Sequence, residues 1–106
     1  LAFFYIKPGC VDAIKAYFAR TWPEEFILIE SEKALEEGLF GLKPHKLETR
    51  DRIGDLIAVP RGTAYLWWAL TPNPMAGRHG GLSTDEMLVP FLALPMDRLR
   101  VISPAR

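Results

Sequence analysis

A single histidine in a glycine-rich stretch is the residue of this sequence best placed for chemistry. His79 lies between Gly77-Arg78 and Gly80-Gly81, and flanking glycines let a backbone approach a ligand closely. A neutral imidazole is a common zinc ligand, but a catalytic zinc takes three protein ligands. The other histidine is His45, and the chain contains neither HExxH nor CxxC. His79 is therefore a candidate metal ligand, with a surface loop histidine as the alternative.

Two neighbours of His79 could bind an anion. Arg78 carries a planar guanidinium that suits a phosphate, although a solvated arginine is the alternative. Downstream, Ser83 and Glu86 form a capping-box pattern, which predicts a short helix over residues 83–88. Its free N–H groups could hold an anion, but the Glu86 carboxylate is expected to occupy that end.

Further side chains have both a functional and a structural interpretation. Trp67 and Trp68 beside Tyr65 could stack on a base or a sugar, but in an apolar run they are more often packing residues. Cys10 could be a reactive thiol at a helix start, or a buried inert one. A basic stretch is interleaved with acids, which is typical of a solvated face; its basic members are Lys43, His45, Lys46, Arg50 and Arg52.

The first half of the chain alternates strand and helix patterns. Apolar runs predict strands over residues 1–6 and 26–29, and a one-sided apolar pattern predicts a helix over residues 11–20. Ser31 is a candidate cap for a short helix that Gly38 ends. Residues 42–52 are expected to form a loop followed by one or two helical turns, which Gly54 stops.

The second half carries more turn chemistry. Residues 55–59 and 64–70 flank Pro60-Arg61-Gly62-Thr63, which predicts a β-hairpin. Residues 71–81 form a loop long enough to be functional, residues 91–94 are apolar again, and residues 99–102 could be an edge strand. The expected fold class is α+β, a small mixed sheet with two to four short helices packed on it in a single compact domain.

Length, charge and cysteine content narrow the function classes. The 106 residues make one domain, and 13 basic against 13 acidic residues give a formal charge of +0. Nucleic-acid binders carry a basic excess that is missing here. One cysteine forms no internal disulfide, and no apolar run approaches the ~20 residues that span a bilayer. We expect a cytoplasmic protein, with neither nucleic acid nor membrane as a partner.

One stretch resembles a known enzyme family. The motifs are R-I-G-D-L-I-A-V-P-R-G at residues 52–62 and G-R-H-G-G-L-S-T-D-E-M-L-V-P at residues 77–90. In this order they resemble the C-terminal part of prokaryotic type I phosphodiesterase/nucleotide pyrophosphatase-like proteins of the alkaline phosphatase superfamily. Residues 30–41 resemble the cap region before that end, and the resemblance covers about residues 26–94.

The resemblance implies a metal-dependent hydrolase of phosphate mono- or diesters. It assigns to His79 one ligand position of a two-metal site, usually zinc, while the nucleophile and the remaining ligands have no counterpart here. We therefore expect a single subdomain, with a cap-like region (1–70), the His-Gly-Gly loop and capped helix (71–94) and a tail (95–106). Within a longer parent it would shape the cleft for a phosphate-ester substrate against the rest of the catalytic domain, and alone it would be inert.

Two other interpretations stay open. The chain could be a free-standing α+β binding or oligomerisation module, with the hairpin, Trp67 and Trp68 as its surface. Alternatively, His45 and His79 from two copies could share a metal across a dimer. The abrupt start on an apolar strand at Leu1 favours a fragment of a longer protein.

Overall fold

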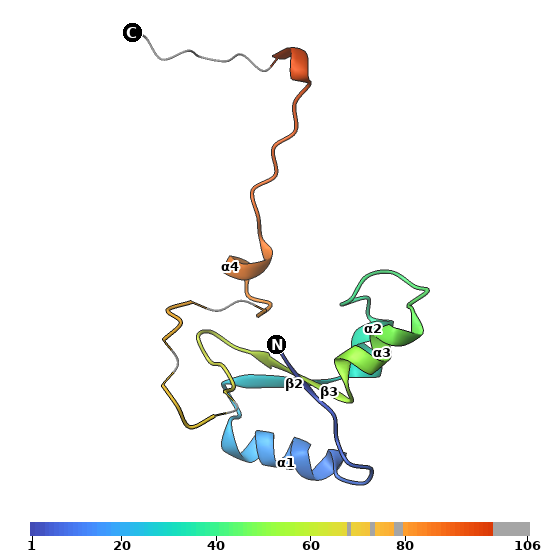
Figure 1. Cartoon of the computed structure of the whole chain (residues 1–106), viewed down its shortest axis with the longest axis vertical. Helices are drawn as coiled ribbons and strands as arrows, with labels where there is room; N and C mark the ends of the chain where they lie inside the picture. Colours follow the sequence, from blue (N-terminus) through green and yellow to red (C-terminus); the bar gives the residue numbers. More distant parts are fainter. Residues whose placement is uncertain (68, 73, 78–79, 99–106) are drawn as a thin grey trace.

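A three-stranded antiparallel sheet organises the chain. The computed structural model describes residues 1–67, 69–72, 74–77 and 80–98. Strands β1 (Ala2–Phe4), β2 (Phe26–Glu30) and β3 (Leu56–Pro60) lie in the order β1-β3-β2. The central strand is thus the last of the three in the sequence (Figure 1). Together with the helices, this sheet confirms the predicted α+β class and single domain.

The register of the sheet assigns its side chains to two faces. Phe3 and Ile29 both pair with Ile57, whereas Ala2 and Leu28 both pair with Ala58. Directly paired residues project to the same side of a sheet. One face therefore carries Ile57 and the other carries Ala58, and both are fully buried.

A different helix covers each face. On the Ala58 face, α1 (Val11–Thr21) places Phe18 edge-on against Phe4 and Phe26, with ring centroids 5.6 and 6.0 Å apart. On the Ile57 face, Ala34 of α2 (Ser31–Glu36) packs with Ile57 and Val59. Alternation along a strand explains why both faces of β3 need a cover.

Three further helical segments complete the fold. Helix α3 (Leu47–Ile53) ends at Gly54, whose φ of +66° favours glycine. Helix α4 is Thr84–Met87, and a 3-10 turn spans Met96–Arg98. The predictions of α1, α3 and the short helix after residue 83 are confirmed within one or two residues at most boundaries.

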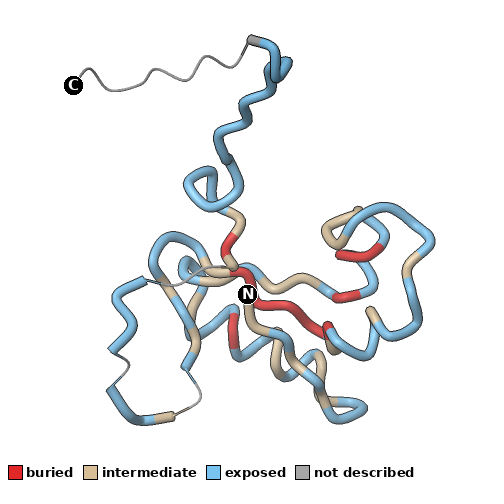
Figure 2. Tube along the Cα trace, turned by 45° about the horizontal axis from the view of Figure 1, so that its top comes forward, coloured by how far each residue is buried: buried red, intermediate tan, exposed pale blue. Residues whose placement is uncertain are grey.

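The fully buried core side chains of the described residues lie in the first sixty residues. Among the described residues, the buried hydrophobic side chains are Phe18, Ala34, Leu35, Ile53, Leu56, Ile57, Ala58 and Val59. Figure 2 shows this concentration of buried backbone at the sheet, while the chain after α4 is exposed. The second half contributes half-buried Leu82 to the cluster on the Ile57 face.

Two sequence predictions are wrong. Residues 64–67 and 69–70 form no strand, so β3 does not belong to a hairpin and pairs instead with β1 and β2. Ser31 is the first residue of α2 rather than its cap, and its buried hydroxyl donates to the Ile53 carbonyl oxygen at 3.2 Å. The predicted strand over residues 99–102 lies outside the described residues.

No described helix combines the length and the apolar character needed to cross a bilayer.

Candidate functional site

The backbone that follows His79 is tied to the start of β1. The Leu1 backbone nitrogen donates to the Gly80 carbonyl oxygen at 2.5 Å. Gly80 has a φ of +97°, and a Cβ there would lie 3.1 Å from the Leu1 nitrogen. Gly80 is thus required both for its backbone conformation and for this close approach.

A second anchor joins Gly81 to α4. The Gly81 N–H donates to Glu86 Oε1 at 2.8 Å, and the Ser83 hydroxyl donates to Glu86 Oε2 at 2.8 Å. A Cβ on Gly81 would overlap the Glu86 carboxylate. The predicted capping box is therefore half right, because Glu86 reaches back as expected while the Ser83 hydroxyl bonds to Glu86 instead of capping a backbone N–H.

The environment of Glu86 stabilises its ionised form. The hydrogen bond from the Ser83 hydroxyl lowers the pKa of Glu86 most, followed by the Gly81 N–H. Donors to a carboxylate favour the charged form over the neutral one. The carboxylate therefore occupies the start of α4, as the sequence predicted for this position.

Of the two histidines and Arg78, the structure describes His45. Arg78 and His79 lie outside the described residues, as does Trp68. The half-buried ring of His45 has Nε2 3.1 Å from the Leu35 carbonyl oxygen. Within the described ranges, no three His, Cys, Asp or Glu side chains are grouped to hold a metal ion.

The other sequence candidates take structural positions. Tyr65 and Trp67 are exposed on a segment with no regular structure, so the strand that would have aligned them as a stacking platform is missing. Cys10 is half-buried and precedes α1 as its N-cap residue. Of the predicted basic face, Arg50 pairs with Glu32 across α3 and α2.

A small polar hollow lies where α2 and α3 meet the ends of β1 and β3. It has a volume of about 320 Å³ and includes Tyr5, Asp51 and Asp55. The Tyr5 hydroxyl donates to the Asp51 carbonyl oxygen at 2.7 Å, and the Ile6 N–H donates to Asp55 Oδ2 at 2.6 Å. These bonds fix the turn between β1 and α1 onto the sheet, which is a structural role.

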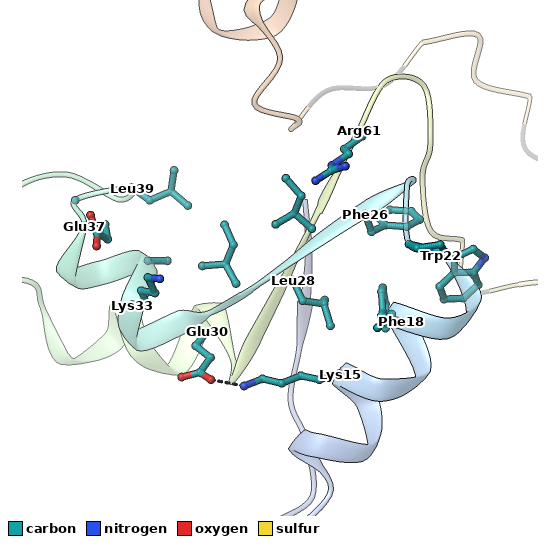
Figure 3. A pocket seen from close by; sticks show the side chains of 16 residues that line it. Lys15, Phe18, Trp22, Phe26, Leu28, Glu30, Lys33, Glu37, Leu39 and Arg61 are labelled. Carbon is teal, nitrogen blue, oxygen red and sulfur yellow. Dashed lines mark hydrogen bonds and ion pairs between the residues drawn. The ribbon is translucent and has the colours of Figure 1, made fainter.

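A second hollow is an open groove along β2, of about 930 Å³. All five β2 residues line it, so it follows the edge of β2 opposite β3. Figure 3 shows Phe18 of α1 and Trp22, which follows α1, on one side of the strand, and Lys33, Glu37 and Leu39 on the other. We call this hollow the β2 groove.

The β2 groove combines an apolar floor with a charged residue at each end. Ile27 is 41% exposed within it. Arg61 lies at the start of β2, where its N–H donates to the Glu25 carbonyl oxygen, and Lys33 lies beyond the end of β2 in α2. The lining carries Lys15, Lys33 and Arg61 against Glu30 and Glu37. Sequence analysis identified β2 as an apolar strand but could not identify it as an edge strand, because its partner lies 30 residues downstream.

Comparisons with known proteins add no assignment. No protein-family model, no curated protein and no solved structure matches this chain.

Proposed function

We propose that this chain is a cap-like α+β part of a metal-dependent phosphodiesterase or phosphohydrolase of the alkaline phosphatase superfamily. In this proposal His79 supplies one ligand to a divalent metal, with zinc as the first choice, and Arg78 contacts the phosphate ester. The remaining ligands and the nucleophile belong to the rest of the catalytic domain. The chain alone is inert, and the whole protein is cytoplasmic.

The observation that carries the proposal is the H-G-G-L-S-T-D-E pattern at residues 79–86. Its first glycine supports the proposal because Gly80 takes a positive φ that favours glycine. The backbone N–H of Gly81 donates to the Glu86 carboxylate. The chain that leaves residue 79 is thus held at the sheet and at α4, which suits a ligand that must keep a fixed position.

The absent metal would act as a Lewis acid on a phosphoryl oxygen. One histidine is too few for such a site, since catalytic zinc needs about three protein ligands. What this chain contributes is the anchored loop and an imidazole next to a guanidinium, which is a chemistry suited to an anionic ester.

The test uses the complete reading frame of the gene, expressed with zinc. Hydrolysis of bis(p-nitrophenyl) phosphate and bound zinc per protein are measured for the unmodified protein and for His79→Ala. We expect His79→Ala to lose at least about 100-fold in kcat/KM, because even second-shell partners of metal ligands are worth about 10- to 100-fold. Zinc content should fall with it.

His45→Ala is the matched control, because His45 contacts the Leu35 carbonyl oxygen and should keep activity and zinc content. Unchanged zinc and unchanged turnover in His79→Ala would overturn the assignment of this ligand. Hydrolysis by the 106-residue chain with zinc, in proportion to protein across preparations, would overturn its inertness alone.

A further inference from the structure

The outer edge of β2 is open for another strand. In the described part of the chain β2 pairs with β3 alone. An edge strand presents a row of unpaired N–H and C=O groups that can template a further strand. Because α1 and the end of α2 stand on either side, the β2 groove is a slot open to an extended segment rather than to a bulky element.

The same chain exposes an apolar segment that runs from the Leu88 N–H, bonded to the Thr84 carbonyl oxygen, to the 3-10 turn that begins at Met96. Residues 88–96, which we call the strap, leave the body after α4 (Figure 1). Phe91 and Leu92 are 87% and 88% exposed. Pro90 and Pro95 hold the residues before them in extended conformations, so the strap is preorganised as a strand-like peptide.

The strap and the β2 groove match in length. The five residues of β2 span about 17 Å at the usual rise of a strand. Between its two prolines the strap offers four residues with backbone N–H groups, Phe91 to Leu94. Proline cannot donate to a sheet, so the prolines delimit a pairing stretch of nearly the length of β2.

Charge contributes little to this pairing. Asp85 and Glu86 precede the strap, but Asp97 after it is followed at once by Arg98. In the β2 groove, Arg61 at one end pairs with Glu24, and Lys33 at the other end lies with Glu37. The pairing therefore depends on apolar side chains and on backbone hydrogen bonds rather than on charge.

We propose that residues 91–94 of a second copy add as a fourth strand to the edge of β2, and that two copies exchange straps to form a two-fold dimer. The exchange places the apolar strap side chains in the β2 groove and pairs the exposed backbone of both segments. It is isologous, so both straps and both grooves are used and the assembly closes. The inference does not depend on the phosphohydrolase proposal.

The exposed strap offers apolar surface for such a contact. A standard interface buries about 1,600 Å² in total, so each of two equal contacts between a strap and a β2 groove would bury about 800 Å². Six large apolar side chains of the strap are 51–88% exposed and are available for burial; these side chains are Leu88, Val89, Phe91, Leu92, Leu94 and Met96.

The test measures molecular mass by sedimentation velocity over about 1 to 100 µM of the 106-residue chain, a range that detects micromolar affinity. We expect a rise from the 12.0 kDa monomer to twice that mass. Ile27→Lys puts a charge in the β2 groove and Leu92→Lys puts one on the strap. Each alone should weaken dimerisation at least about tenfold.

Mixing the two variants gives the decisive result. The strap of the Ile27→Lys variant and the β2 groove of the Leu92→Lys variant are both unchanged. In a one-to-one mixture, these two can form one intact contact. We expect the mixture to associate where neither variant does alone. Leu42→Lys, on a loop residue that is 93% exposed and does not line the β2 groove, is the control and should dimerise normally.

Every other pattern overturns the exchange. If Ile27→Lys alone blocks association, two β2 edges pair directly. If Leu92→Lys alone does so, straps pair with straps. A chain that stays monomeric, or that forms a ladder of larger species, also contradicts the closed dimer. Should Ile27→Lys lose its cooperative thermal transition, Arg61→Glu tests the same groove from an exposed position.

Discussion

The first sixty residues contain the buried apolar side chains of the sheet, whereas the described residues beyond them leave most of their large apolar side chains exposed. All buried hydrophobic residues of the described chain lie between Phe18 and Val59. Beyond residue 60 the large apolar side chains, from Leu70 to Met96, are mostly exposed. Both regions contain large apolar residues, so hydrophobicity does not explain the difference in burial. A side chain is buried only where its backbone belongs to a helix or strand that packs against another element.

Proline and glycine explain why the later region does not pack on the sheet. Pro72, Pro74, Pro90 and Pro95 interrupt it, and each removes an N–H that a strand would need. In the described part of the chain, the region beyond residue 60 contacts the body at Gly80, which bonds to Leu1, and at Leu82, which packs on the core. The exposed apolar side chains of the strap remain available to a partner.

The largest expected effect separates the two regions directly. Ile57→Ala should cost about 2–5 kcal/mol, because the side chain is fully buried at 0% exposure between both neighbouring strands. Leu92→Ala should cost less than about 0.5 kcal/mol in the monomer, as for an ordinary surface change. Urea unfolding at a concentration where the chain is monomeric measures both. Equal losses of unfolding free energy in the two variants would contradict the difference in packing between the two regions.

The next effect concerns two glycines with similar positive φ angles. Gly54 and Gly62 have φ of +66° and +59°, but only at Gly54 would a Cβ overlap the Phe4 carbonyl oxygen. Gly62→Ala should cost about 1–2 kcal/mol from the left-handed conformation alone. Gly54→Ala should add about 1–3 kcal/mol for overpacking against β1. A similar melting temperature for both variants would show that the β1 backbone shifts away from the new Cβ at little cost.

A smaller, local effect tests the anchor after His79. Gly81→Ala should displace the Glu86 carboxylate and raise its pKa towards the ordinary 4.5, since the Ser83 hydroxyl and the Gly81 N–H now lower it. Carboxyl NMR titration measures this change. Gly77→Ala is the control, because a Cβ there has open space. An unshifted Glu86 in Gly81→Ala would mean that the carboxylate keeps its donors.

The same carboxylate gives α4 a predictable pH dependence. A depressed folded-state pKa contributes stability that is present above the unfolded value and is lost as pH falls through the folded one. Protection of the α4 amides should therefore decline only at acidic pH, below about 4.5. Glu86→Gln should abolish this dependence, and an unchanged pH profile in that variant would assign it to another group.

The smallest effect is expected at the exposed ion pair between Lys15 and Glu30. Their hydrogen bond lowers the pKa of Glu30 and raises that of Lys15. Solvent screens such a pair, so Lys15→Met should leave the melting temperature nearly unchanged while the Glu30 pKa returns towards its ordinary value. A large loss of stability would instead show that the Lys15 stem supports the rim of the β2 groove.

The elements predicted from the sequence were those set by local rules. The apolar spacing of Val11, Ile14 and Phe18 was enough to predict α1, and Gly54 marked the end of α3. The predicted hairpin after β3 was wrong. The prediction relied on the turn residues at 60–63, whereas β3 pairs with strands that lie far away in the sequence. Ala58 pairs with Ala2 and Leu28, and no local pattern encodes such a choice.

In the candidate site too, the local features could be predicted from the sequence and the long-range contacts could not. The Ser83 and Glu86 spacing led to the carboxylate at the start of α4, but the anchor between Gly80 and Leu1 joins residues 79 positions apart. The β2 groove was missed because being at an edge is a property of the whole sheet. The sequence does show the apolar β2 run and the apolar strap separately.

The position of β3 at the centre of the sheet also sets an order of events during synthesis. Since β1 and β2 contact each other only through β3, neither has a sheet partner until residues 56–60 have been made. A nascent chain that has emerged as far as α2 holds helices and two unpaired apolar strands. We expect cooperative folding to begin only when β3 inserts between them, so the last strand to be translated is the one that closes the sheet.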